Sequence, residues 1–126
     1  EGWFVPLYRN RQLYIRRSVM DHLGWRDVHR VAIWLSEADA SLLITPADWI
    51  DRAKKIKPFR DLPLLQTSRA WGMYKTRGVS IGRVGKLIGL GPGDYTHFEA
   101  VRCPLGYYLR VRKLRTEVAK RGAATG

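Results

Sequence analysis

The chain has 126 residues, 45% of them hydrophobic, and carries 23 Lys and Arg against 11 Asp and Glu, a formal net charge of +12. This length holds one domain or two very small ones, and five Trp with this hydrophobic content exclude a disordered chain. The charge favours a polyanionic partner, nucleic acid first and anionic membrane second, although a basic domain can also simply be soluble.

The first 46 residues predict four short strands and one short helix. Pro6 places the first strand at a sheet edge, and a basic turn follows at 9–12. Ser18 suits the N-cap of the helix and Gly24 its C-terminal end. The strand at 29–35 presents Val, Ile and Leu on one face and Ala and Trp on the other. The expected elements are strands at 3–8, 13–15, 29–35 and 42–46 and a helix at 16–24.

Residues 47–69 predict a helical linker. Thr45 and Pro46 suit the N-cap and the first helical position, and apolar residues follow at helical spacing until Pro58 ends the pattern. Residues 59–69 are expected to continue as linker.

Residues 70–114 predict the order of elements found in the first half. The basic turn here is 76–78, and the charge is concentrated in this half of the chain. Residues 1–63 hold 11 basic and 8 acidic side chains, whereas residues 64–126 hold 12 and 3. A basic tail follows at 115–126. The expected elements are strands at 70–75, 79–81, 95–101 and 107–114 and a short helix at 82–89.

Each half therefore predicts a strand, a basic turn, a strand, a short helix ending in Gly, and two more strands. The alignment needs one residue fewer in the second helix and two more in the loop after it. Two copies are too few for a solenoid, so the repeat indicates a pseudo-dimer within one chain. The alignment pairs Ile15 with Ile81, Arg17 with Arg83, Arg11 with Arg77, Gly24 with Gly89, and Asp27 with Asp94.

The second half, RGVSIGRVGKLIGLGPGDYTHFEAV with GYYLRVRK, within 77–113, resembles the AbrB/MazE/SpoVT-type swapped-hairpin (looped-hinge-helix) DNA-binding family. Residues 9–46 resemble a second, more diverged copy. The resemblance implies a mainly β fold with short helices (α+β). Two swapped-hairpin half-barrels would form an intrachain pseudo-dimer, joined by the linker helix. The domains would be 1–46, the linker 47–69, 70–114, and the tail 115–126.

The resemblance also implies a basic face that meets double-stranded DNA. Matching motif positions place on it Arg9, Arg11, Arg16 and Arg17 from the first copy, and Lys75, Arg77, Arg83 and Lys86 from the second. A further basic stripe begins with Arg110 and Arg112 in the last strand, and it suits phosphate contact or the protection of an exposed edge strand equally well.

Enzyme chemistry is not indicated. Ser80 and Leu87 break the phosphate-loop spacing, the three His lack metal-ligand spacing, and no pair of catalytic carboxylates is evident. The single Cys103 excludes an internal disulfide and fits a reducing compartment.

We therefore expect no enzyme, cofactor, metal or membrane partner. The expected function is that of a DNA-binding transcription regulator or a chromatin-like architectural protein, cytoplasmic and nucleoid-associated in a bacterium or archaeon, and able to self-assemble further. The alternative is an RNA- or ribosome-associated basic protein, and an antitoxin-type partner of a toxin ranks below both.

Overall fold

A computed structural model describes residues 2–6, 11–72 and 76–114. They form one eight-stranded sheet in the order β1-β7-β8-β4-β3-β5-β6-β2, in which every paired strand is antiparallel to its neighbour. The strands are β1 (Gly2–Pro6), β2 (Gln12–Arg16), β3 (Arg30–Ser36), β4 (Ser41–Pro46), β5 (Leu64–Trp71), β6 (Thr76–Ser80), β7 (Tyr95–Cys103) and β8 (Gly106–Lys113).

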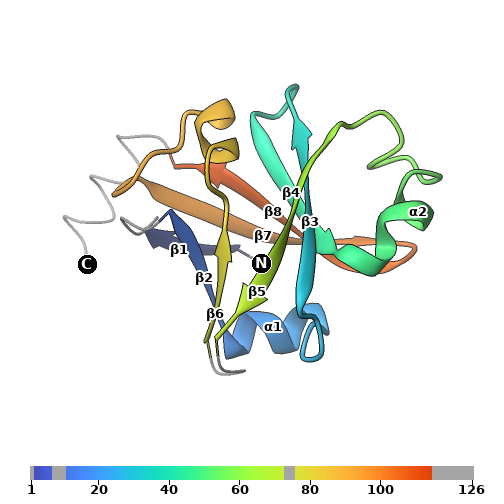
Figure 1. Ribbon diagram of the computed structural model, residues 1–126, viewed down its shortest axis with the longest axis horizontal. Helices are drawn as coiled ribbons and strands as arrows, with labels where there is room; N and C mark the ends of the chain where they lie inside the picture. Colours follow the sequence, from blue (N-terminus) through green and yellow to red (C-terminus); the bar gives the residue numbers. More distant parts are fainter. Residues whose placement is uncertain (1, 7–10, 73–75, 115–126) are drawn as a thin grey trace.

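The sheet curls until its edge strands β1 and β2 are in contact (Figure 1). The helix α1 (Arg17–Leu23) lies at one end of the curl, and the 3-10 helix η2 (Val84–Ile88) lies at the other (Figure 1). Apolar side chains of both helices, such as Met20 and Ile88, join the core inside the curl. The prediction of a mainly β fold with short helices is therefore confirmed.

Strand β3 is buried on both faces because each face meets a different core. Val31 and Ile33 point into the inner core. Ala32 and Trp34 point outward, into a second cluster that residues 47–62 cover. The Trp34 Nε1–H donates to the Thr45 hydroxyl at 3.1 Å. The predicted alternation of this strand is confirmed.

The covering segment is less helical than its sequence pattern predicts. A 3-10 turn, η1 (Ala47–Trp49), leads into α2 (Ile50–Ala53), and the α-helix ends there. Beyond it the buried or half-buried apolar residues recur every third position, and i→i+3 bonds between their backbones follow the same period. A three-residue period favours successive 3-10-like turns over an α-helix. The residues in this period are Ala53, Ile56, Phe59 and Leu62.

Strand β5 begins at Leu64, inside the stretch predicted to be linker, and β6 begins at Thr76, where a turn is predicted. The inward positions of β5 include the polar residues Gln66 and Ser68, so the apolar alternation is hidden. Both side chains donate to the Ser80 carbonyl at 2.9 Å, which ties β5 to β6.

Exchanging β1–β4 with β5–β8 maps every strand pair but one onto a strand pair. The pairs β3–β4 and β7–β8 exchange, as do β3–β5 and β7–β1, whereas β4–β8 and β2–β6 map onto themselves. The remaining pair, β5–β6, has its counterpart in the contact between β1 and β2. Both short helices also end alike, at Gly24 with φ 74° and at Gly89 with φ 73°.

The offset between the two halves can be read at the ends of the hairpins, because the β4–β8 ladder maps onto itself under exchange of its strands whatever the offset is. Strand β3 ends at Ser36 and β7 at Cys103, 67 residues apart. Asp27 and Asp94 are also 67 residues apart, so the hairpin ends agree with their predicted match. Residues 37–40 connect the first hairpin and residues 104–105 the second, so the first hairpin loop is two residues longer.

Two predicted helix caps are wrong. The N-cap position of α1 is Arg16, whose side chain makes no capping hydrogen bond with the described residues, and Ser18 lies inside the first turn. The N-cap position of η1 is Pro46. The hydroxyl of Thr45 instead accepts the hydrogen bond from Trp34.

Candidate nucleic-acid interface

Strands β5, β6 and β2 are adjacent in the sheet and contain no Asp or Glu. Leu13 and Ile15 of β2 point into the inner core, so Arg16 points to the outer face of the sheet. On β5, Ala70 joins the inner core and Arg69 points outward. Both arginines are exposed. We call the outer face of these three strands the acid-free face.

A third exposed arginine stands beside this face. Arg30 begins β3 and is the direct cross-strand partner of Arg69. Like charges that face each other in this way destabilise a sheet. Within the described ranges, neither of them nor Arg16 forms an ion pair. An anion bound between them would relieve the repulsion.

Further cations lie at the two ends of the β2–β6 pair, next to the short helices. At the α1 end, Arg17 is exposed and lies 3.8 Å from Asp21, and Arg26 is exposed as well. At the η2 end, Arg83 and Lys86 are both exposed. Arg11 precedes β2 at this end and is half-buried, with a φ of 58°.

The structure thus brings the predicted residues Arg16 and Arg17 to one end, and Arg11, Arg83 and Lys86 to the other. Predicted residues Arg9 and Lys75 lie outside the described residues.

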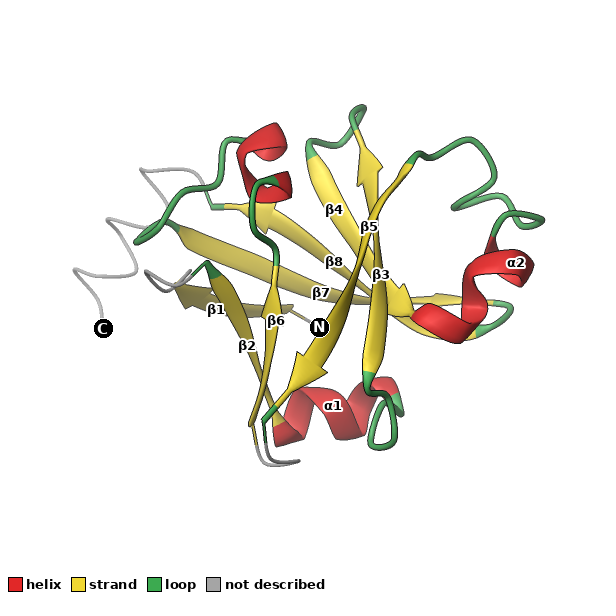
Figure 2. Ribbon diagram, in the orientation of Figure 1, coloured by secondary structure: helices red, strands yellow, loops and turns green. Residues whose placement is uncertain are grey.

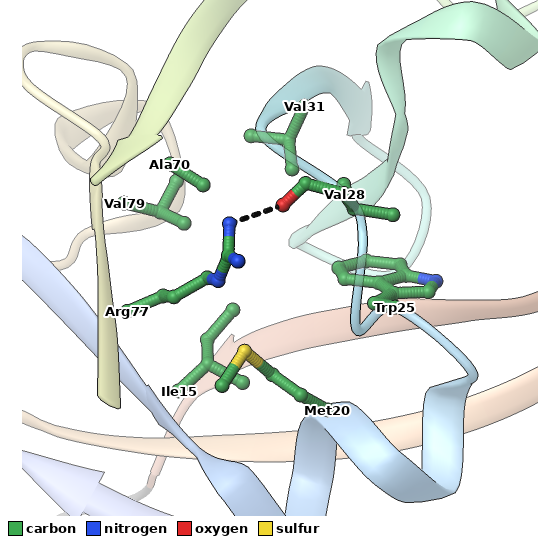
Figure 3. Close-up of a pocket in the computed structure, with 8 residues that line it drawn as sticks. All are labelled: Ile15, Met20, Trp25, Val28, Val31, Ala70, Arg77 and Val79. Carbon is green, nitrogen blue, oxygen red and sulfur yellow. Dashed lines mark hydrogen bonds between the residues drawn. The ribbon is translucent and has the colours of Figure 1, made fainter. Parts of the chain in front are cut away.

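Arg77 differs from the other predicted contacts because it is buried, with 7% of its surface exposed. It pairs with Ile15 in the β2–β6 ladder and, like Ile15, points inward. One terminal nitrogen donates to the Val28 carbonyl at 2.7 Å (Figure 3). The same nitrogen lies 2.9 Å from His29 Nδ1, and the other terminal nitrogen donates to the Arg26 carbonyl at 3.2 Å. Its guanidinium therefore holds the loop before β3 and does not reach the acid-free face.

A small cavity lies beside the Arg77 guanidinium, between α1, β3 and β6 (Figure 3). Its volume of about 10 Å³ is roughly that of one water molecule, and its walls are almost wholly apolar. The Arg77 Nε–H is buried and has no hydrogen-bond partner among the described residues. The cavity is too small for an organic ligand.

Arg110 and Arg112 lie on β8, which runs between β7 and β4 and is not an edge strand. The Arg110 guanidinium donates twice to one carboxylate oxygen of Glu99, at 2.6 and 3.1 Å, and lies 3.8 Å from Asp39. Arg112 lies 3.6 Å from the same Glu99 oxygen. These arginines are therefore largely neutralised. They are weaker candidates for phosphate contact than Arg16 and Arg69, which form no ion pair in the part of the chain that the structure describes.

The Glu99–Arg110 pair has an expected signature in acid. The hydrogen bond from Arg110 holds the pKa of Glu99 below its ordinary value, so the unfolded chain binds more protons than the folded chain as the pH falls. Glu99→Gln is expected to lower the free energy of unfolding by about 1 kcal/mol at neutral pH. The stabilisation is present above the ordinary pKa of glutamate and is lost as the pH drops through the folded pKa.

Urea unfolding of wild type and Glu99→Gln through the acid range measures this difference. The two unfolding curves should converge in strong acid. A gap that stays constant from neutral pH to strong acid would contradict the assigned ion pair.

Three arginines of the interface were missed by the sequence prediction. Arg26, Arg30 and Arg69 come from different segments, and only the fold shows that Arg30 and Arg69 face each other. One signal was available, since the chain has no acidic residue between Asp61 and Asp94.

Comparisons with known proteins yield no relative. No protein-family model matches the chain, and neither a curated protein nor a solved structure matches it.

In the part of the chain that the structure describes, no helix has the length and apolar character needed to cross a membrane. No three His, Cys, Asp or Glu side chains gather there as metal ligands would.

Proposed function

We propose that this protein binds double-stranded DNA through the acid-free face, as a transcription regulator or a chromatin-like architectural protein. The observation that carries the proposal is a set of three exposed arginines, Arg16, Arg30 and Arg69, which form no ion pair with any described residue. Two of them, Arg30 and Arg69, face each other directly. Arginine is suited to this role because its planar guanidinium donates two parallel hydrogen bonds to a phosphate.

The length of the β2–β6 pair suits this partner. Five residue pairs span about 16 Å, close to half of the roughly 34 Å helical repeat of B-DNA. Cations at both ends of the pair would contact phosphates half a helical turn apart. The α1 end carries Arg16, Arg17 and Arg26, and the η2 end carries Arg83 and Lys86. The two ends would therefore contact the duplex with unequal numbers of cations.

In this proposal the two halves of the chain are diverged copies of a swapped-hairpin unit, fused into a pseudo-dimer. The exchange symmetry of the strand pairs supports this origin, as do the matching glycine ends of the two short helices. One half supplies only four short strands, too little core to be stable alone.

Binding of a fluorescent duplex of roughly two helical turns, measured from about 50 to 200 mM salt, tests the proposal. Wild type should bind with an affinity that falls steeply with salt. The triple variant Arg16→Gln/Arg30→Gln/Arg69→Gln should lose about tenfold or more in affinity. The slope of log affinity against log salt concentration, which we call the salt slope, should be shallower by about 3 in this variant. A flat salt dependence, or an unchanged affinity in the triple variant, would remove the acid-free face from consideration.

A matched pair of single variants provides the control. Arg69→Gln and Arg102→Gln each remove one exposed strand arginine, but Arg102 lies on β7, away from the acid-free face. Only Arg69→Gln should reduce the salt slope, by about 1. Competition with duplex RNA and with single strands decides between DNA and the RNA-associated alternative.

A further inference from the structure

A second group of cations lies on residues 47–62. This segment covers the second apolar cluster, on the outer face of β3, which we call the outer core. Residues 52–60, RAKKIKPFR, hold five cations and no acidic residue. All five side chains are exposed, and none forms an ion pair with any residue that the structure describes. We call this group the cationic cover; its members are Arg52, Lys54, Lys55, Lys57 and Arg60.

The cationic cover is fixed to the sheet by apolar anchors. Ala53 and Phe59 are fully buried, and the Phe59 ring lies 5.5 Å from Trp34 and 5.0 Å from Tyr108, centroid to centroid. Backbone hydrogen bonds link each turn of the segment to the next, from Lys54 to Leu62. The five cations therefore project from an ordered scaffold.

The cationic cover and the acid-free face lie on different parts of the curled sheet. The cover packs on β3, β4 and β8 through Trp34, Leu43 and Tyr108. The acid-free face belongs to β5, β6 and β2, which follow β3 in the strand order. Figure 2 shows α2 at one side of the molecule and β2 and β6 toward the other. A duplex bound to β2 and β6 would leave the cover open to solvent.

We infer that the cationic cover is a second phosphate-binding surface, by which a protein bound to one DNA duplex takes hold of another. This inference rests on the proposed function. Five cations in nine residues, without an internal counter-charge, match the dense charge of a duplex backbone, which carries one phosphate per about 1.7 Å.

The same residues fit an anionic membrane poorly. A segment that lies in a membrane interface needs apolar side chains to insert below the headgroups. Here the apolar residues Trp49, Phe59 and Leu62 pack against the sheet, and the exposed side chains are charged. An acidic protein partner would also be expected to find an apolar anchor at the centre of its interface, and the cover offers none.

Energy transfer between two duplexes tests this inference. One duplex carries a donor dye and the other an acceptor, so transfer requires that both are held together. The variant Lys54→Gln/Lys55→Gln/Lys57→Gln should bind a single duplex within about threefold of wild type but lose most of the transfer. The salt slope for the second duplex should fall by about 3. Arg102→Gln should behave as wild type does in both measurements.

The possible outcomes separate the two proposals. If wild type binds no duplex, the proposed function and the second surface fail together. If wild type binds one duplex without transfer, or the triple lysine variant bridges as well as wild type, only the second surface fails. Sedimentation of the protein alone excludes bridging through protein self-association, because the lysine variant must keep the wild-type oligomeric state. Binding to phosphatidylserine vesicles that this variant loses, with bridging retained, would overturn the inference in favour of a membrane.

Discussion

Replacing Phe59 with alanine is expected to lower the free energy of unfolding by about 3–5 kcal/mol. The ring is fully buried and is the largest apolar group that residues 50–62 contribute to the outer core. Its removal leaves a cavity against Trp34 and Tyr108, which lie on strands of the sheet and cannot move to fill it.

Urea unfolding measures the loss, and Leu87→Ala is the control because 59% of the Leu87 surface is exposed. The control should stay within about 0.5 kcal/mol of wild type. Limited trypsin digestion adds a local measurement, because release of the cover would open the bonds after Arg52, Lys54 and Lys55 to cleavage. A loss below about 1 kcal/mol, with no faster cleavage in the cover, would show that Phe59 does not anchor the segment.

Where local pattern and tertiary packing agree, the sequence was sufficient to predict the fold. The alternation in 29–35 requires only a strand between two apolar environments, and β3 has both. Gly24 and Gly89 end the two short helices because each adopts a left-handed conformation that glycine tolerates best. These features depend on neighbours within a few residues, so the chain order alone reveals them.

Features that depend on distant partners could not be predicted. The start of β5 was missed because Gln66 and Ser68 occupy inward positions, where bonds to Ser80 satisfy them. The helix predicted to run to Pro58 ends at Ala53. Beyond that point every third residue packs against the sheet, and this spacing fits 3-10-like turns and not an α-helix.

The candidate interface shows the same division. Arg16, Arg17, Arg83 and Lys86 were predicted from their positions beside the short helices, and all four are exposed. The opposed pair Arg30 and Arg69 depends on the register between β3 and β5, which are far apart in sequence. No local pattern specifies that register, so the pair could be recognised only from the sheet.

Arg77→Met is expected to lower the free energy of unfolding by about 1–3 kcal/mol. The arginine donates charge-assisted hydrogen bonds to the carbonyls of Val28 and Arg26, and methionine of similar length can make neither. Two features of wild type oppose this loss, since no described carboxylate neutralises the buried charge and its Nε–H has no partner. We expect the bonds to outweigh both, because they join β6 to the loop before β3. Amide exchange in residues 24–29 should rise in the variant.

Duplex binding separates this structural role from direct contact. Arg77→Met should weaken DNA binding by a few fold, because the loop that carries Arg26 and leads to Arg30 is less well held, yet the salt slope should remain that of wild type. Arg16→Gln, which removes an exposed cation, should lower the slope by about 1.

Arg77→Lys keeps the charge but cannot donate in two fixed directions, so it should resemble the methionine variant in stability. If the methionine variant is as stable as wild type, the free-energy cost of burying the Arg77 charge is at least as large as the stabilisation from its hydrogen bonds. A slope reduced by about 1 would mean that Arg77 reaches a phosphate after all.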